Sequence, residues 1–144
     1  MSEGPLLPLV DEDSAPFFEA ARRGELRVQR CSASHRLVFP PRALSPFAPG
    51  APLEWVGVSG RGTIWSFAVP HPPLLPYYAG LAPYNVVVVA LEEDPTVRLV
   101  GNLVAREGGL ISEISPAEIR IGARVRASFE RLSSEITVPR WVPL

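Results

Sequence analysis

Apolar and polar positions alternate with period two along much of this chain, which is the pattern of β-strands. The alternation is clearest after residue 52, where short apolar runs are separated by glycine and proline turns. The run 84–91 is apolar on both faces and therefore predicts a central strand. Five runs without a long helix between them fit a partly open Greek-key barrel. These runs are 55–58, 63–69, 84–91, 97–104 and 125–129.

A short helix is predicted before the strands. Asp13 or Ser14 can cap its start, Pro16 fits the first turn, and Gly24 can end it. Its buried stripe would consist of Phe17, Phe18 and Ala21. After the helix, the alternation of 26–29 predicts a strand, and 37–39 predicts the strand that turns back beside it. Residues 40–52 are expected to form a loop.

The segment 26–49 is spaced like a small zinc ribbon that has lost its ligands. Two pairs of thiolates with a ten-residue spacer would require cysteines at four positions, where the sequence has Cys31, Ser34, Ser45 and Ala48. A structural zinc needs four nitrogen or sulfur donors, and the two histidines, His35 and His71, are too few to replace three thiolates. We therefore expect no bound metal. Apolar side chains would instead pack the segment against the barrel or another protein, namely Leu37, Val38, Phe39, Leu44 and Phe47.

Length and charge narrow the class of protein. The 144 residues suffice for one compact domain, or a domain with a small appendage, and the formal net charge is -1. With a net charge this close to zero, the chain has no overall electrostatic field that would attract nucleic acid or an anionic membrane. Every lysine or arginine position holds an arginine, which suits bidentate phosphate contacts, although high-GC codon usage is the simpler explanation. A single cysteine excludes an internal disulfide and agrees with a reducing cytoplasm.

Secretion and membrane insertion are not expected. The start of the chain is acidic rather than basic, unlike a signal peptide. The stretch 63–91 has no Asp, Glu, Lys or Arg and is long enough to span a bilayer, but five prolines interrupt any helix there. We interpret this stretch as two strands joined by a loop.

The connection 70–83 is the loop with the strongest functional signal. Connections of this length are uncommon in compact domains and are usually functional or disordered. Its prolines reduce the entropy lost on docking, and its tyrosines offer amphipathic rings that favour interfaces. We predict that it contacts a partner through Pro73, Leu74, Leu75, Tyr77 and Tyr78. A packed surface loop without a ligand is the alternative.

Two side chains are candidates for ligand contact. Arg61 lies between two glycines on a tight turn and could reach a phosphate, including those of coenzyme A. His71 lies where a strand ends and the long loop begins, a position from which a barrel presents side chains to a ligand. A solvated cation and a solvated imidazole are the alternatives.

Catalytic chemistry within the chain has little support. Cys31 could attack a thioester, with Arg30 favouring the thiolate, but no base other than His35 is at hand. No Ser-His-Asp triad can be drawn from the sequence. Aromatic residues on the strands could form a base-stacking platform for single-stranded nucleic acid, but the charge balance opposes it. These aromatic residues are Trp55, Trp65, Phe67 and Tyr84.

Several sequence stretches together resemble the acyl-CoA-associated OB-fold proteins, catalogued as domain of unknown function thirty-five. They are LRVQRC from 26, FPPR from 39, WVGVSGRGTIWS from 55, APYNVVVVALEEDPTVRLVGNLV from 82, IGARVRASFE from 121, and PRW from 139. The resemblance covers nearly the whole chain and implies a mainly β fold. It implies a tail and helix over 1–24, a degenerate rubredoxin-like ribbon over 25–50, and a five-stranded OB-fold barrel over 51–144.

The resemblance also implies a function. Proteins similar to this one work beside thiolase-like or lipid-transfer-type partners, including thiolases, steroid side-chain aldolases and acyltransferases. The chain would then be a cytoplasmic, non-catalytic subunit that helps bind acyl-CoA and completes the partner's site. Arg42, with Arg61 and His71, would touch coenzyme A or the mouth of the acyl site, and Phe39 and Phe47 would join the partner surface. The alternatives are an OB-fold module for nucleic acid and a stand-alone acyl-CoA thioesterase.

Overall fold

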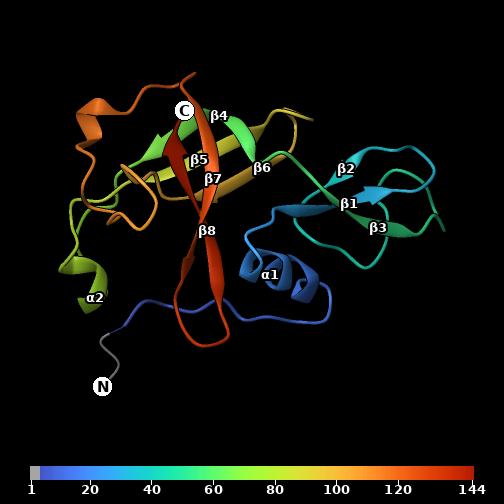
Figure 1. Ribbon diagram of the computed structural model, residues 1–144, viewed down its shortest axis with the longest axis horizontal. Helices are drawn as coiled ribbons and strands as arrows, with labels where there is room; N and C mark the ends of the chain where they lie inside the picture. Colours follow the sequence, from blue (N-terminus) through green and yellow to red (C-terminus); the bar gives the residue numbers. More distant parts are fainter. Residues whose placement is uncertain (1–3) are drawn as a thin grey trace.

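The computed structural model describes residues 4–144, so the first three residues of the expected tail lie outside the described part. Figure 1 shows two sheets with a helix between them. The elements are α1 (Ala15–Arg22), β1 (Arg27–Cys31), β2 (Leu37–Val38), β3 (Leu53–Gly57), β4 (Arg61–Ala68), α2 (Pro76–Ala79), β5 (Val86–Leu91), β6 (Arg98–Gly101), η1 (Pro116–Glu118), β7 (Arg124–Arg131) and β8 (Thr137–Pro143).

The larger sheet has five antiparallel strands in the order β6-β5-β4-β7-β8. It curls so that its two edge strands approach each other, and a parallel bridge joins Leu103, two residues after β6, to Trp141 on β8. A bulge in β4 between Ile64 and Ser66 contributes local curvature. This arrangement confirms the prediction of a mainly β chain with an N-terminal helix and a five-stranded OB-fold barrel. It also confirms that 84–91 contains a central strand, because β5 pairs on both sides.

One strand of the barrel was predicted wrongly. The run 55–58 belongs to β3, which pairs with β1 in the small sheet β2-β1-β3, with Gln29 opposite Trp55. The physical reason is that β1 is buried and needs partners on both edges, while the two-residue β2 covers only one of them. The fifth barrel strand is β8, which was not predicted because Pro139 and Pro143 are untypical of a β-strand. Prolines are tolerated there because β8 is an edge strand.

The helix α1 matches its predicted limits. Ser14 is the N-cap residue, and its backbone N–H donates to Asp11 Oδ1 at 2.8 Å, so Asp11 completes the turn that enters the helix. Gly24 follows the C-cap with φ +76, a conformation that glycine adopts without strain. Phe17 and Ala21 are buried as expected, and Phe18 is partly buried. The helix contacts β8, β1 and β7, so it lies between the two sheets.

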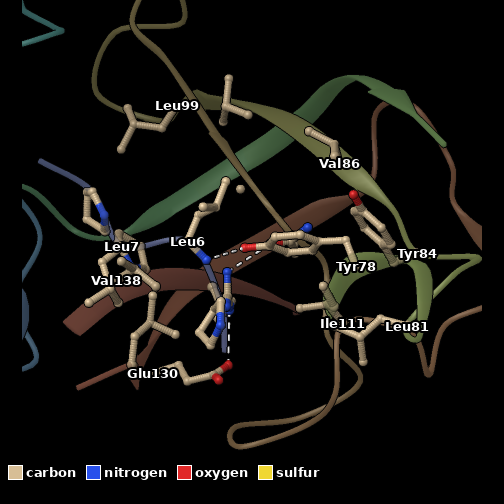
Figure 2. A pocket seen from close by; sticks show the side chains of 18 of the residues that line it. Leu6, Leu7, Tyr78, Leu81, Tyr84, Val86, Leu99, Ile111, Glu130 and Val138 are labelled. Atoms are coloured by element: carbon tan, nitrogen blue, oxygen red, sulfur yellow. Dashed lines mark hydrogen bonds and ion pairs between the residues drawn. The ribbon is translucent and has the colours of Figure 1, made fainter. Parts of the chain in front are cut away.

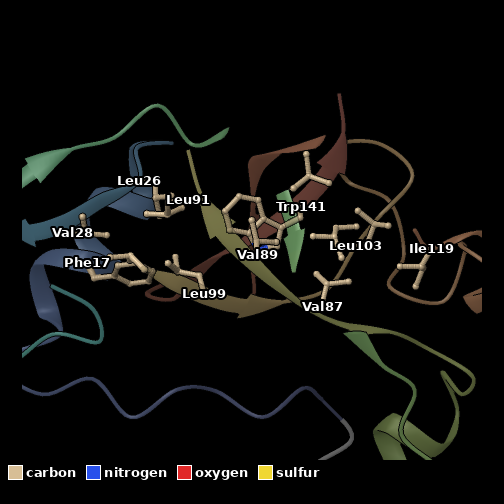
Figure 3. Close-up of a cluster of buried hydrophobic side chains, with 13 residues drawn as sticks. Phe17, Leu26, Val28, Val87, Val89, Leu91, Leu99, Leu103, Ile119 and Trp141 are labelled. Atoms are coloured by element: carbon tan, nitrogen blue, oxygen red, sulfur yellow. The ribbon is translucent and has the colours of Figure 1, made fainter. Parts of the chain in front are cut away.

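One hydrophobic cluster connects the helix, the small sheet and the barrel, as Figure 3 shows from Val28 and Phe17 across to Trp141. Trp141 is fully buried inside the barrel. Gly101 on β6 permits this, because a Cβ atom at residue 101 would lie 2.9 Å from the indole Nε1 and Cδ1 atoms. The ribbon segment is therefore anchored by the same core as the barrel. Within residues 4–144, no helix is long and apolar enough to cross a bilayer.

Candidate functional site

The ribbon segment brings two of its three missing-ligand positions, Ser34 and Ser45, to Cys31. The Ser34 backbone N–H donates to Cys31 Sγ at 3.4 Å. Hydrogen bonds from the hydroxyls of Ser34 and Ser45, in that order of effect, lower the pKa of the buried Cys31 thiol to about 7. Three of the four positions predicted from spacing thus meet in space. Across residues 4–144, no group of three or more His, Cys, Asp or Glu side chains could hold a metal ion.

The Gln29 side chain holds the loop that follows the small sheet. It is buried, and its amide forms two hydrogen bonds with the backbone of Arg42, at 2.8 Å and 2.7 Å. A buried amide with both ends bonded fixes the backbone without metal. The guanidinium of Arg42 is exposed, so its position on the surface is set by Gln29.

Three of the five apolar side chains expected to replace the metal pack against the core. Val38 is buried, and Leu37 and Phe39 contact the main hydrophobic cluster, with Phe39 5.6 Å from the Phe17 ring. Leu44 and Phe47 lie on the surface, and the Arg36 guanidinium stacks on the Phe47 ring at 4.3 Å. The prediction that Leu44 and Phe47 pack against the barrel core was therefore wrong. Their contact with another protein, the other alternative, stays a prediction.

The loop 70–83 folds over one end of the barrel and contains α2. Tyr78 packs at 5.8 Å from Tyr84, and Tyr77 packs edge-on against Tyr78 at 5.1 Å. The Tyr78 hydroxyl accepts a hydrogen bond from the Leu6 backbone N–H at 3.0 Å, so the loop meets the N-terminal segment. Of the residues predicted to bind a partner, Pro73 and Leu75 are exposed, whereas Leu74, Tyr77 and Tyr78 are half-buried. Leu74 and Tyr78 pack against a second, smaller cluster.

A cavity of about 860 Å³ lies where the N-terminal segment crosses the gap between β6 and β8. Figure 2 shows Tyr78, Leu81, Tyr84 and Ile111 around one side of it and Leu6, Leu7 and Val138 around the other. No local sequence pattern predicts this cavity, because its walls come from segments far apart in the chain. A partial signal was present: the apolar stretch 5–10 has no role in a helix or strand, yet it is rich in leucine.

Two of the three charged side chains at the cavity form an ion pair, and the third stacks on an aromatic ring. Arg140 Nε donates to Glu130 Oε1 at 3.0 Å, and its Nη1 donates to Asn102 Oδ1 at 2.8 Å. The Arg98 guanidinium stacks on the Trp65 ring at 3.8 Å. Asn102 also donates to the backbone carbonyl of Asn85, a buried residue whose own amide bonds to Leu103. The cavity is therefore a largely apolar space whose margin carries one ion pair and one stacked arginine.

The predicted contacts to coenzyme A lie in three separate places. Arg61 begins β4, and His71 follows three residues after β4 ends, so more than about 20 Å of strand separates them. Arg42 lies in the ribbon loop. All three side chains are exposed, and among the described residues none of them forms a side-chain hydrogen bond or an ion pair. Directly opposite Arg61 on β7 is a second cation, Arg126, which pairs with Glu107.

The possible catalytic and nucleic-acid features do not assemble. Within the described chain, no side-chain hydrogen bond links Cys31 to His35 or His71. Of the aromatic residues considered as a stacking platform, Tyr84 is buried, and Trp55 belongs to the small sheet rather than the barrel. The Trp65 ring is covered on one face by Arg98. The four rings therefore do not form one continuous surface.

Known proteins similar to this chain agree with its fold and with the resemblance. A family described as "ChsH2, C-terminal OB-fold domain" matches residues 55–130. A solved chain from an Ltp2-ChsH2(DUF35) aldolase is 33% identical, with a TM-score of 0.75, and the match covers 94% of this chain and 98% of that one. A DUF35 domain-containing scaffold protein of Methanocaldococcus jannaschii is 28% identical over 108 residues, which are 74% of this chain and 68% of that protein.

Two curated relatives are longer proteins. A probable enoyl-CoA hydratase alpha subunit of Thermomonospora curvata is 35% identical over 94% of this chain. A 3-oxo-4,17-pregnadiene-20-carboxyl-CoA hydratase alpha subunit of Mycobacterium tuberculosis is 34% identical over 93% of it. The matches cover 39% and 37% of these relatives, so the chain spans about two fifths of their length.

Proposed function

The chain belongs to the ChsH2 C-terminal OB-fold family within the acyl-CoA-associated DUF35 proteins, and from this we propose that it is a non-catalytic subunit of an acyl-CoA-processing complex. Its partner is a thiolase-like or lipid-transfer-type protein that carries the catalytic residues. The chain docks onto this partner in the cytoplasm, helps bind acyl-CoA and completes the partner's site.

One observation carries this proposal. The similarity to a chain of the Ltp2-ChsH2(DUF35) aldolase covers 98% of the matched chain and 94% of this one, so nearly all of this structure corresponds to one chain of that enzyme. The two hydratase relatives are likewise alpha subunits. A fold alone does not determine function, but similarity over the full length of a known subunit supports the same kind of role.

The surface supports a docking role. Several large apolar side chains of the N-terminal segment and of the 70–83 loop are exposed, and exposed apolar surface of this kind often marks a site of interaction with another protein. Leu9 is 95% exposed, Leu6 65% and Leu75 55%. The partner surface in this proposal includes Pro73, Leu74, Leu75, Tyr77 and Tyr78, together with Phe39 and Phe47 of the ribbon. Phe39 contributes only its exposed edge, because the rest packs on Phe17.

The proposed contacts to coenzyme A follow from position. Arg61 and Arg42 have exposed guanidinium groups without an ion-pair partner among residues 4–144, so they are free to meet phosphates. His71 lies at the opposite end of β4 from Arg61. A single extended acyl-CoA can meet both only if its phosphates lie toward Arg61 and its acyl end toward His71.

Purification of the tagged chain from its native host tests the proposal. We expect a thiolase-like or lipid-transfer-type protein to co-purify in a fixed ratio and to be identified by mass spectrometry. The reconstituted pair should turn over an acyl-CoA that neither protein converts alone. A chain that stays alone in its host would contradict the proposal, and so would thioester hydrolysis by the pure chain that is lost when His71 or Cys31 is replaced.

A further inference from the structure

The cavity beneath the N-terminal segment has the dimensions of a ligand site. Its volume of about 860 Å³ falls within the range of roughly 300–1,000 Å³ that small-molecule sites occupy. Its walls come from the N-terminal segment, α1, the 70–83 loop, β5 and β6, and the hairpin of β7 and β8. It exists because β6 and β8 are the two edges of the barrel sheet and are joined by one bridge just after β6, which leaves a gap beside them.

The chemistry of the walls selects an apolar and uncharged ligand group. Of the described residues that line the cavity, three are charged. Arg140 is neutralised by Glu130, and Arg98 is stacked on Trp65 outside the barrel. Arg98 keeps its charge but lies at the exposed margin of the cavity, against the Trp65 ring. One cation at the margin is a poor match for the several phosphates of coenzyme A, so we expect the coenzyme A moiety to remain outside the apolar space. An unpaired buried charge would have made the cavity costly for hydrocarbon, and the ion pair removes that cost.

The cover of the cavity is weakly attached. Leu6 and Leu7 lie across its mouth, and Figure 2 shows Tyr78 reaching toward the Leu6 backbone. The bond from the Leu6 N–H to the Tyr78 hydroxyl is the one hydrogen bond that ties the stretch 4–10 to the rest of the described chain. Segments with few hydrogen bonds and few buried contacts open at low free-energy cost. The Tyr78 hydroxyl, which accepts from Leu6, retains its own proton for donation to a ligand oxygen.

We propose that this cavity binds the acyl group of the thioester on which the complex acts, and that residues 5–8 are its movable cover. The ligand class is a largely apolar acyl group, either a long chain or a fused-ring system, with Tyr78 donating to an oxygen of that group. This inference rests on the proposed function, since it takes acyl-CoA as the substrate of the complex. It adds a site on this chain for the part of the substrate that the exposed arginines do not recognise.

The test is a titration of the isotope-labelled full chain, followed by NMR, with dodecanoyl-CoA, lithocholoyl-CoA and free coenzyme A. We expect one or both thioesters to shift the signals of Leu6, Val86 and Ile111, and free coenzyme A to leave them unchanged. The two thioesters distinguish a chain-shaped from a ring-shaped ligand. Equal shifts with free coenzyme A, or none with either thioester, would overturn the proposal.

Two variants that fill the cavity make the test specific. Replacing Ile111 or Val138 with tryptophan should weaken thioester binding by about tenfold or more, because the ring occupies the space of the ligand. The matched control is Ile121→Trp, which adds the same ring at a position 66% exposed and outside the cavity, and binding should not change. A fully folded Ile111→Trp or Val138→Trp protein that binds as tightly as the parent would contradict the proposal.

The conservative variant Tyr78→Phe tests the cover through exchange of the Leu6 amide in the ligand-free chain, a readout that the loss of the Tyr78 bond to the ligand does not affect. It keeps the ring packed against Tyr84 and removes the hydroxyl that holds Leu6. We expect the Leu6 amide to exchange with solvent faster and the thioester to associate faster, by a few fold in each case. Unchanged exchange and association rates would show that residues 5–8 do not act as a cover.

Failure of this inference is distinguishable from failure of the proposed function. If the Ile111→Trp chain still captures the partner and thioester binding is absent from the parent, the cavity assignment falls and the subunit role stands. If the parent binds thioester in the cavity but captures no partner, the subunit role falls and the cavity assignment stands.

Discussion

The side-chain amide of Gln29 is hydrogen-bonded at both ends to the backbone of Arg42: Nε2 donates to the Arg42 carbonyl at 2.8 Å, and the Arg42 N–H donates to Oε1 at 2.7 Å. Gln29 is buried on β1, so the pair connects the core of the small sheet to a loop that contains little regular structure. A zinc ion would constrain this kind of loop through its ligands. Here a polar side chain supplies the constraint.

We predict that Gln29→Met lowers the free energy of unfolding by about 2–3 kcal/mol, since it removes two hydrogen bonds and leaves backbone groups unpaired. Chemical denaturation measures this loss. The matched control is Arg42→Ala, which leaves the Arg42 backbone and both hydrogen bonds in place and should change stability by less than about 0.5 kcal/mol. Equal stability of Gln29→Met and the parent would contradict the role given to Gln29.

The ionisation of Cys31 is expected to depend on two serines. Hydrogen bonds from Ser34 and Ser45 lower its pKa from 9.0 to about 7. The pKa of the thiol is lower in the folded chain than in the unfolded chain, so the ionised thiol stabilises the fold. This stabilisation is fully present above pH 9 and is lost as the pH falls through about 7. Ser34→Ala and Ser45→Ala should each raise the pKa, as followed by the ultraviolet absorbance of the thiolate against pH. Ser32→Ala is the neighbouring control, and a parent thiol that titrates near 9 would contradict the prediction.

Restoring the missing ligands tests whether the frame of a zinc site survives. Ser34 and Ser45 already lie at the Cys31 thiol, so the triple variant Ser34→Cys, Ser45→Cys, Ala48→Cys should bind about one zinc ion per chain with four thiolates. Metal analysis and the spectrum of the cobalt-substituted protein measure this. The parent is the control: a chelator should leave its unfolding midpoint unchanged. If the triple variant binds no metal, the four positions do not converge.

Gly101 is predicted to be intolerant of a side chain. A Cβ atom there would lie 2.9 Å from the indole of Trp141, which is fully buried and cannot move without disturbing the core. Gly101→Ala should therefore destabilise the protein by about 1–3 kcal/mol. Gly57→Ala on β3 is the control, because nothing lies within 4 Å of the added atom. Thermal unfolding of both variants compares them, and similar losses would show that Trp141 is not the cause.

Leu75 offers a test of the docking surface. It is 55% exposed in the loop 70–83, so Leu75→Asp should leave the fold intact and reduce partner capture by about tenfold or more. Ile121→Asp changes a comparably exposed apolar residue, 66% exposed, at a turn outside this loop and should retain the partner. Quantitative mass spectrometry of the captured protein provides the measurement. Loss of capture in both variants would place the interface elsewhere or make it non-specific.

Local features of the chain were predictable because they depend on neighbours in sequence. The helix start near Ser14 and its end at Gly24 follow from capping and from the φ that glycine allows. The central position of β5 follows from its apolar residues on both faces. The meeting of Cys31, Ser34 and Ser45 was foreseeable from spacing, because two tight turns on a small sheet bring such positions together.

What the sequence by itself determined, then, is the helix α1, the existence and order of seven of the eight strands, the barrel class, and the absence of three of the four thiolates that the ribbon spacing requires. Tertiary structure alone decided which strand edges pair, and so placed β3 in the small sheet and β8 in the barrel. It also decided that an N-terminal segment closes a cavity against Tyr78, 72 positions away. Strand pairing and cavity formation depend on which distant segments can occupy the same strand edge or the same space. A local sequence pattern contains no information about those distant segments.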